Sequence, residues 1–419
     1  MTGPRGNLGR GMNNLPDDDP PGRWAALAIL AFAMLLAMTT WFSASAVLPQ
    51  VRAEWHLSSN TASFLTISVQ LGFIVGAVAS AVLSLADLLA PRRLILYGAI
   101  GAALANALLL ASHGPVTALP LRFITGVCLA GVYPSALKEM ATWFRRGRGT
   151  ALGVTVGALT LGSATPQLVV GLGGVRWQVV IVTTSLLTIA GGVLTSTMGR
   201  DGPFPFPQAK FDPTQARRVV ANRGVRLASI GYFGHMWELY AMWAWFSVFF
   251  ADVLVDHHRS GPYRGAALAT FAVIGIGALG SWVGGVLSDR WGRTRAAGLA
   301  MALSGTTALI IGFTSHLPVW LVLGIGLFWG FWVVADSAQF SAIVIEVADQ
   351  SYVGTAVTLQ LAVGFGLTVV TIWIVPILVA AGSWAWAFGI LAPGPFVGVI
   401  AMARLRRAPE AALIAGGHG

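Results

Sequence analysis

Twelve apolar stretches, each close to the length needed to cross a lipid bilayer, dominate the sequence. A membrane-spanning helix needs about 20 consecutive, mostly apolar residues. Only 10% of the 419 residues are charged, and the mean hydropathy is +0.73. Soluble domains carry roughly 25% charged residues, so these few charges could not cover a surface that faces water. We therefore predict an all-α integral membrane protein with twelve transmembrane helices.

The predicted organisation is two six-helix bundles joined by a linker that is rich in proline and charge. The polar start is longer than that of a usual cleaved signal peptide, so we expect the first apolar run to stay as a helix. The expected spans are 24–49, 62–86, 94–112, 117–143, 149–171, 177–198, 227–252, 265–288, 296–314, 318–346, 354–380 and 384–404. The expected units are a leader (1–23), a first bundle (24–198), a linker (199–226), a second bundle (227–404) and a tail (405–419).

The positions of the basic residues predict the orientation of the chain. Of the 26 Lys and Arg residues, 21 lie in segments that would share one side of the membrane with both termini. Cytoplasmic segments carry an excess of Lys and Arg, so we expect both termini to be cytoplasmic and the protein to lie in the cytoplasmic (inner) membrane. This placement explains the isoelectric point near 10.7 by contacts with lipid headgroups rather than nucleic acid.

Motifs of several enzyme classes are absent from the sequence. Neither lysine, Lys138 or Lys210, follows a glycine, so no Walker A loop is present. The single cysteine, Cys128, excludes an internal disulfide, and no HExxH zinc motif occurs. Asp256, His257 and His258 form a weak metal-like cluster that we interpret as a solvated loop. We therefore expect no catalytic activity, no cofactor and no metal.

Three short runs occur twice, in the same order and at nearly the same spacing. Trp-Phe-Ser at 41–43 returns at 245–247, and Gly-Thr-Ala at 149–151 returns at 354–356. Asp87 with Arg92 and Arg93 returns as Asp289 with Arg293 and Arg295. With six helices in each half, both copies have the same orientation. Such parallel repeats place a substrate site between the halves, near the middle of the membrane.

The run GGVLSDRWGRTR at 284–295 resembles the signature loop of the major facilitator superfamily, Gly-x-Leu-x-Asp-Arg-x-Gly-Arg-x-Arg. Its matching residues are Gly285, Leu287, Asp289, Arg290, Gly292, Arg293 and Arg295. A degraded first copy, SLADLLAPRR, keeps Asp87, Arg92 and Arg93 but lacks the glycine between them. The run WFRRGRG at 143–149 resembles loops of organophosphate, anion–cation and nitrate or cyanate porters. The second and eighth spans lack the mid-span arginines of nitrate porters, and the fifth departs from the Gly-Pro-Gly-Gly pattern of drug antiporters.

The resemblance implies two bundles that rock around a central cavity lined by helices 1, 4, 7 and 10. It also implies that the signature residues form a latch on the cytoplasmic side. A carboxylate can cap a helix N-terminus, and we expect Asp289 to cap Gly354–Thr355 at the start of the eleventh span. The alternative is that the loop charges only set topology. The candidate latch residues are Gly285, Asp289, Arg290, Gly292, Arg293, Asp87, Arg92 and Arg93.

A few polar side chains lie well inside the expected spans, where a charge is costly and usually faces a cavity or a partner. Helical spacing places His235, Glu238 and Trp245 on one face of the seventh span. Glu238 is the first candidate for a proton site, with His235 able to share or relay the proton, and Asp336 is the second. The alternative is a structural His–Glu hydrogen bond. The full candidate set for substrate or protons is Glu238, Asp336, His235, Arg122, Trp41, Trp245, Trp332, Gln339 and Tyr133.

Arg122 and the tryptophans each have two interpretations. Arg122 either pairs with a cavity carboxylate or an anion, or anchors the fourth span near the outer leaflet. Trp41, Trp245 and Trp332 either stack on a substrate or pack as ordinary core. The leading functional hypothesis is a proton-coupled secondary transporter of a small organic solute, acting as a monomer in the bilayer. The alternatives are a proton antiporter that exports drugs or metabolites, and a transporter-like solute sensor.

Overall fold

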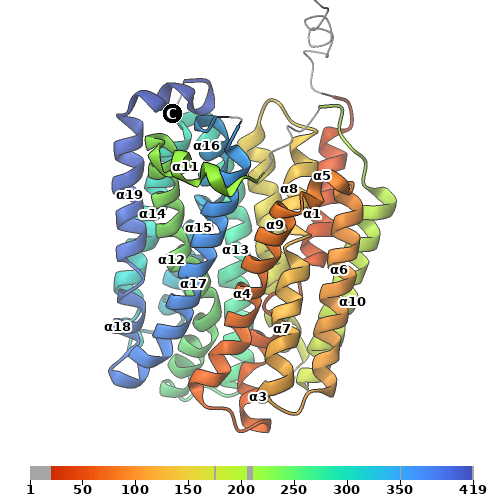
Figure 1. The fold of residues 1–419 in the computed structure, drawn as a ribbon. Helices are drawn as coiled ribbons and strands as arrows, with labels where there is room; N and C mark the ends of the chain where they lie inside the picture. Colours follow the sequence, from red (N-terminus) through yellow and green to blue (C-terminus); the bar gives the residue numbers. More distant parts are fainter. Residues whose placement is uncertain (1–19, 174–175, 205–210, 350, 418–419) are drawn as a thin grey trace, which may run out of the picture.

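The computed structural model describes residues 20–173, 176–204, 211–349 and 351–417, and within these ranges it contains helices but no strand. The helices run nearly parallel to one long axis (Figure 1). Those before residue 198 lie on one side of the view and those after residue 223 on the other, with α4 and α13 between them. The all-helical prediction is therefore confirmed.

Eleven helical segments in the described ranges are long and apolar enough to cross a membrane. Seven of them are single helices: α4 (Ser59–Val82), α9 (Arg148–Gly173), α10 (Trp177–Met198), α12 (Arg223–Asp256), α13 (Pro262–Trp291), α14 (Arg293–Ile311) and α17 (Val353–Ala381). An eighth, Pro91–Ala111, consists of α6 (Pro91–Ala107) and the 3-10 helix η1 (Leu108–Ala111) that continues it. Three are interrupted: α7 and α8 (Pro115–Leu129, Tyr133–Ala141), α15 and α16 (Val319–Ala335, Ser337–Val347), and α18 and α19 (Trp384–Gly389, Pro393–Arg406). Short helices α5 (Leu85–Leu88) and α11 (Ala216–Ala221) lie in the connections.

The first apolar run does not form the continuous helix that its composition predicts. Helix α1 (Arg23–Ala37) has 15 residues, and turns follow it before α2 (Ser43–Ala46) and α3 (Leu48–Glu54). At 1.5 Å per residue, α1 spans less than the hydrocarbon thickness of a bilayer. The run at 24–49 is therefore helical but interrupted after Ala37, where buried side chains bind the backbone carbonyls, as described below. A twelfth membrane span stays a prediction.

Two pairs of helices bring the two sequence halves together. Helix α9 packs along α13, and α4 packs along α17. The α9–α13 contact is close because glycines lie in it. A Cβ atom added to Gly285 would lie 2.4 Å from the carbonyl oxygen of Gly149, so only glycine fits at this crossing. The division into two bundles at the expected boundaries stays a prediction.

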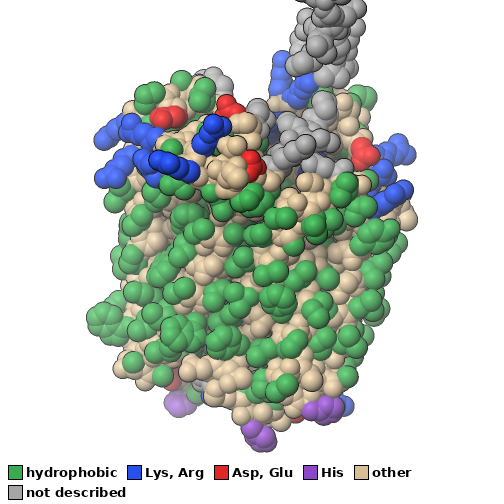
Figure 2. Space-filling model, viewed as in Figure 1, with side chains coloured by type: hydrophobic (Ala, Val, Ile, Leu, Met, Phe, Trp, Pro, Cys, Tyr) green, Lys and Arg blue, Asp and Glu red, His purple; other side chains and the backbone are tan. Residues whose placement is uncertain are grey.

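The surface has an apolar middle and two polar ends (Figure 2). Apolar side chains cover the central band in this view, while Lys and Arg side chains gather at one end and His side chains at the other. We call the first of these the basic end, where α1 begins and α19 ends. Exposed apolar side chains such as Phe32, Leu186 and Trp320 are the ones expected to face lipid.

Candidate functional site

Glu238 lies near the centre of α12 and is buried against two neighbouring helices. Its Oε1 accepts a hydrogen bond from the indole Nε1 of Trp329 at 2.6 Å, and its Oε2 accepts one from the hydroxyl of Ser304 at 2.8 Å. Trp329 belongs to α15 and Ser304 to α14, so one carboxyl group joins three helices. Among the described residues, no Lys, Arg or His pairs with it.

His235 pairs with Asp336 rather than with Glu238. Its Nδ1 lies 2.8 Å from Oδ1 of Asp336, and its Nε2 lies 3.0 Å from the hydroxyl oxygen of Ser337. Asp336 occupies the break between α15 and α16, where its side chain can turn toward α12. The alternative interpretation of a structural His–Glu hydrogen bond is therefore not supported, because His235 binds Asp336 and Ser337. Helical spacing put both side chains on one face, but each reaches a different neighbour.

Gln339 belongs to a network at the basic end. Its Oε1 accepts a hydrogen bond from Arg293 at 3.3 Å, and Arg293 also forms a bidentate pair with the carboxylate of Glu346, at distances from 2.8 to 3.2 Å. A further hydrogen bond reaches Glu346 from the backbone N–H of Ala415. These contacts join the start of α14 to the end of α16, so Arg293 is held within the second half.

Arg122 is fully buried and acts as a cap for interrupted backbone. Its guanidinium donates to the carbonyl oxygens of Thr40 and Trp41, which lie where α1 is broken. It also donates to Oδ1 of Asn106 at 2.9 Å and to the hydroxyl of Ser43. Carbonyls bound by Arg122 do not need the N–H groups of a following helical turn, which explains the broken first span. Asn106 was not among the residues predicted from the sequence, because a single amide in an apolar run has no distinctive local pattern.

An aromatic cluster joins the two halves at the middle of the molecule. Its members are Trp41, Phe42, Phe73, Tyr240, Trp243 and Phe365. Phe73 of α4 and Phe365 of α17 have ring centroids 4.4 Å apart, and Trp41 lies 5.9 Å from Tyr240 of α12. Separating the halves must therefore separate these rings.

Two buried amides lie on the helices that carry this cluster. Gln70 is three residues before Phe73 on α4, and Gln360 is five residues before Phe365 on α17. Both side chains are at most 1% exposed, and neither amide oxygen nor nitrogen has a hydrogen-bond partner among the described residues. Buried polar atoms are almost always paired. These two amides are therefore candidates for hydrogen bonds to a ligand.

The remaining candidates lie apart from these groups. Trp245 donates its indole N–H to the carbonyl oxygen of Ile372 at 3.0 Å, which ties α12 to α17. Trp332 is half-buried and contacts Phe331 of its own helix, and Tyr133 begins α8 and packs against the core. The part of the chain that the structure describes holds no group of three His, Cys, Asp or Glu side chains placed to bind a metal.

The Asp289 carboxylate caps a helix of the other half. Its Oδ1 accepts from the N–H of Gly149 at 3.2 Å, and its Oδ2 accepts from the N–H and the hydroxyl of Thr150, both at 2.9 Å. The expected partner at Gly354–Thr355 is therefore wrong. The two helix starts share one Gly-Thr-Ala run, so the sequence could not tell them apart. The hydroxyl of Thr355 instead contacts the backbone of Asp212.

Other latch candidates differ in their contacts. Gly292 has a positive φ of 93° where α13 ends and α14 begins, which suits glycine. Arg290 and Arg93 are exposed, and Arg92 donates to the carbonyl oxygen of Gly199 and pairs with Asp201 at 3.2 Å. The side chain of Asp87 lies outside the described residues.

Proteins described as a probable transporter, a resistance protein and an efflux pump resemble this chain at low identity. A protein described as a probable sulfoacetate transporter, from Cupriavidus necator, is 22% identical over 325 residues, which cover 70% of this chain and 72% of that protein. A puromycin resistance protein from Streptomyces alboniger is 30% identical over 36% of this chain and 30% of its own length. A multidrug efflux pump from Mycolicibacterium smegmatis is 28% identical over 46% of this chain and 39% of its own length.

A sequence profile of the Major Facilitator Superfamily matches residues 30–255, which is more than half of the chain. The match covers the helices from α1 to α12, including the aromatic residues of the first half and Glu238. The apolar helices and the relatives agree with it. The chain therefore belongs to the Major Facilitator Superfamily of transporters and is a multi-pass integral membrane protein.

Proposed function

We propose that the protein is a proton-coupled secondary transporter that moves a small organic solute by alternating access. One observation carries this proposal. Glu238 is buried in the middle of a spanning helix and is held by two neutral donors, without a cationic partner in the described chain. The Ser304 hydroxyl can donate to a carboxylate or accept from a carboxylic acid. Glu238 can thus keep its neighbours whether it carries a proton or not.

The His235–Asp336 pair supports a second titratable site one helical turn away. Asp336 lies where α15 breaks, so a change in its charge acts on a helix end rather than on a continuous helix. Interrupted helices are where transporters commonly place coupling groups. We assign Glu238 as the proton site and the His235–Asp336 pair as the group that links its occupancy to the position of α16.

The substrate class follows from the aromatic cluster and the two unpaired amides. Rings from both halves offer flat apolar surfaces, and Gln70 and Gln360 each offer one acceptor and two donor hydrogens. Arg122 has its donors bound to carbonyl and amide oxygens, so it does not supply a free cation for an anion. The proposed substrate is an organic molecule with an apolar or aromatic body and neutral hydrogen-bonding groups.

Alternating access would use contacts at two places along the long axis of the molecule. The aromatic cluster closes the middle, and the Asp289 cap on α9 closes the basic end, both between the two sequence halves. Opening toward the basic end must break the Asp289 contacts. We propose that both termini and this end face the cytoplasm, that the membrane is the cytoplasmic (inner) one, and that the monomer is the functional unit.

The second candidate is export of apolar compounds in exchange for protons. It is favoured by the aromatic cluster and by relatives whose names describe resistance and multidrug efflux. The probable sulfoacetate transporter matches over more of both chains, and its name leaves the direction open.

The test is transport in proteoliposomes of the purified full chain, with a pH gradient imposed in either direction and a panel of neutral aromatic solutes. Glu238→Gln should abolish the response to the gradient while exchange of solute without a gradient persists. The matched control is Asp252→Asn, because Asp252 is on the same helix and also accepts from an indole, that of Trp384 at 2.9 Å. Gradient-driven transport that survives in the Glu238→Gln variant would refute the assignment.

A further inference from the structure

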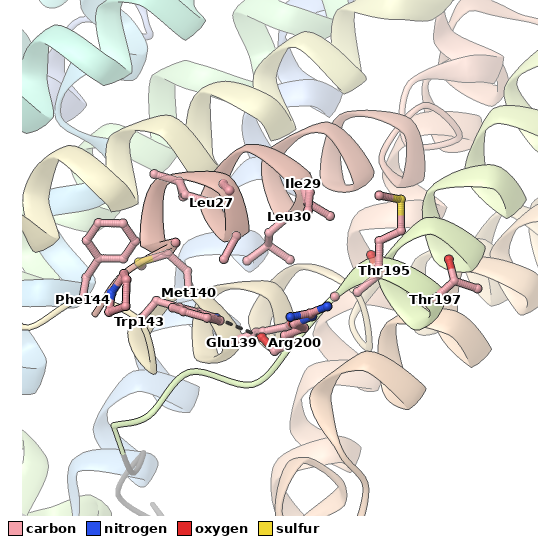
Figure 3. Close-up of a pocket in the computed structure, with 16 residues that line it drawn as sticks. Leu27, Ile29, Leu30, Glu139, Met140, Trp143, Phe144, Thr195, Thr197 and Arg200 are labelled. Atoms are coloured by element: carbon pink, nitrogen blue, oxygen red, sulfur yellow. Dashed lines mark hydrogen bonds between the residues drawn. The ribbon is translucent and has the colours of Figure 1, made fainter. Parts of the chain in front are cut away.

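A separate cavity of about 400 Å³ lies near the basic end of the first half, away from the aromatic cluster. It is formed by the start of α1, the end of α8 with the turn that follows it, and the end of α10 (Figure 3). Leu27, Leu30 and Met140 give it an apolar wall, and the rings of Trp143 and Phe144 lie at one side. Glu139 also lines the cavity.

The carboxyl group of Glu139 is incompletely satisfied. The side chain is only 2% exposed, and its Oε2 has no hydrogen-bond partner among the described residues. Leaving such an acceptor unpaired is unfavourable, and more so for a charged group. A cavity beside an unpaired carboxyl oxygen is therefore a site for a hydrogen-bond donor.

Neighbouring charges do not fill this role. Arg92 binds the carbonyl oxygen of Gly199 and Asp201 through its two terminal nitrogens, while its buried Nε has no hydrogen-bond partner among the described residues. Arg200 is exposed at the cavity, where its carbonyl oxygen accepts from the indole of Trp143. Arg200 and Glu139 both line the cavity (Figure 3). A ligand here would meet one unpaired acid and, at the rim, one base.

The second half contains a carboxylate at the corresponding position whose hydrogen bonds are satisfied. Glu346, near the end of α16, binds Arg293 through both carboxylate oxygens and accepts from Ala415. Glu139, near the end of α8, lies in the corresponding part of the first half, but Arg92 turns to Asp201 instead. Of these two corresponding carboxylates, only Glu139 has a buried oxygen without a hydrogen-bond partner among the described residues.

We propose that this cavity binds a primary ammonium group carried on an apolar or phosphate-bearing body. An ammonium has three donors and no acceptor, so it can satisfy Glu139 with a charge-assisted hydrogen bond. The ring of Trp143 offers a cation–π face, Leu27 and Leu30 contact the carbon chain, and Arg200 can bind a phosphate at the rim. Two sources fit this chemistry: the ethanolamine headgroup of a membrane lipid, and a soluble alkylamine.

The experiment measures the thermal stability of the purified full chain, in detergent with choline lipids, during titration with n-hexylammonium. n-Hexanol, which has the same carbon chain but no charge, is the control ligand. We expect a saturable rise in Tm with the amine and little with the alcohol. Glu139→Gln should weaken the apparent affinity for the amine about tenfold or more, since a charge-assisted bond is lost.

A second variant and a control keep the result interpretable. Ala25→Phe fills the cavity from the exposed side of α1 without altering Glu139, and it should also weaken amine binding. Glu54→Gln is the control, because Glu54 is a carboxylate that binds the indole of Trp177, and it should leave amine binding unchanged.

Experiments with two different lipids distinguish a lipid ligand from a soluble amine. If the ligand is a lipid, phosphatidylethanolamine will be retained over phosphatidylcholine in native mass spectra, and hexylammonium will displace it from wild type but not from Glu139→Gln. If the ligand is soluble, amine affinity will be the same in either lipid. Equal stabilisation by hexanol and hexylammonium would overturn the proposal. So would unchanged amine affinity in Ala25→Phe, even if Glu139→Gln does not fold.

Discussion

Asp289 at the end of α13 binds Thr150 at the start of α9 twice, because both the N–H and the hydroxyl of Thr150 donate to Oδ2 at 2.9 Å. The two residues come from different halves of the sequence. A carboxylate at a helix N-terminus is stabilised by the unpaired N–H groups and the helix dipole. The contact therefore joins helices from the two halves.

Removing this attachment should change transport rate more than substrate affinity. Capping residues contribute about 0.5–2 kcal/mol, so Asp289→Asn should change the maximal rate several-fold and leave KM nearly unchanged in proteoliposome assays. Thr150→Ala should give a similar change, and the double variant should cost less than the sum of the two. Thr355→Ala is the matched control, since Thr355 contacts Asp212 instead. Additive effects of Asp289→Asn and Thr150→Ala would contradict the pairing.

Arg122→Met should destabilise the protein strongly. The buried guanidinium satisfies the carbonyls of Thr40 and Trp41 together with Asn106, and removing one partner from a buried charged network costs about 3–5 kcal/mol. We expect a large fall in Tm of the purified protein. Arg264→Met serves for comparison, because Arg264 also binds carbonyl oxygens, those of Gly171 and Leu172, but from the start of α13 outside the core. Equal losses for both variants would show that burial of Arg122 is unimportant.

Gln70→Leu and Gln360→Leu should separate stability from function. Each substitution removes an unpaired buried amide, so Tm should stay the same or rise. If the amides bind substrate, KM for transport should rise at least about fivefold, as expected for a lost hydrogen bond of roughly 1 kcal/mol. Gln339→Leu should instead lower Tm, since Gln339 accepts from Arg293. Unchanged KM in both amide variants would exclude them from the substrate site.

His235 and Asp336 should behave as one unit. Asp336→Asn or His235→Gln alone leaves one member of a buried pair without its partner, which is strongly destabilising. The double variant should recover a large part of the lost Tm, because neither charge remains. A double-mutant cycle on thermal stability measures this coupling. If the loss in the double variant equalled the sum of the two single losses, the 2.8 Å contact between His235 and Asp336 would contribute nothing to stability.

Acid should loosen the linker locally at Asp212. Hydrogen bonds from the hydroxyl and then the N–H of Thr214 hold the pKa of Asp212 below its ordinary value. Because the pKa of Asp212 is lowered in the folded protein, these bonds stabilise the local fold fully above the ordinary pKa. This stabilisation is lost as pH falls through the lowered pKa. The protection of the Thr214 amide, measured as its hydrogen-exchange rate relative to the intrinsic rate at the same pH, should persist at pH 5 and be lost in strong acid. In Asp212→Asn the step should vanish, and a step that persists there would point to another group.

Composition and local pattern were enough to predict the helices, because burial in lipid requires long apolar segments whatever their neighbours are. Eleven spans and the superfamily followed from runs such as 177–198 and from the signature around Asp289. Two features depended on tertiary contacts. The first apolar run breaks because Arg122, which is distant in sequence, binds its carbonyls.

The second feature is the choice of hydrogen-bond partner for each buried polar side chain. Helical spacing placed His235 and Glu238 on one face, but the choice of Asp336 for one and Trp329 for the other depends on which helices pack against α12. The internal repeat likewise offered Asp289 two equivalent helix starts. Only the packing of α13 against α9 decided between them. The sequence by itself determined which segments form helices long and apolar enough to cross a membrane, since length and composition are properties of each segment. The tertiary structure decided which polar groups meet, since buried hydrogen bonds need exact distances between segments remote in the chain.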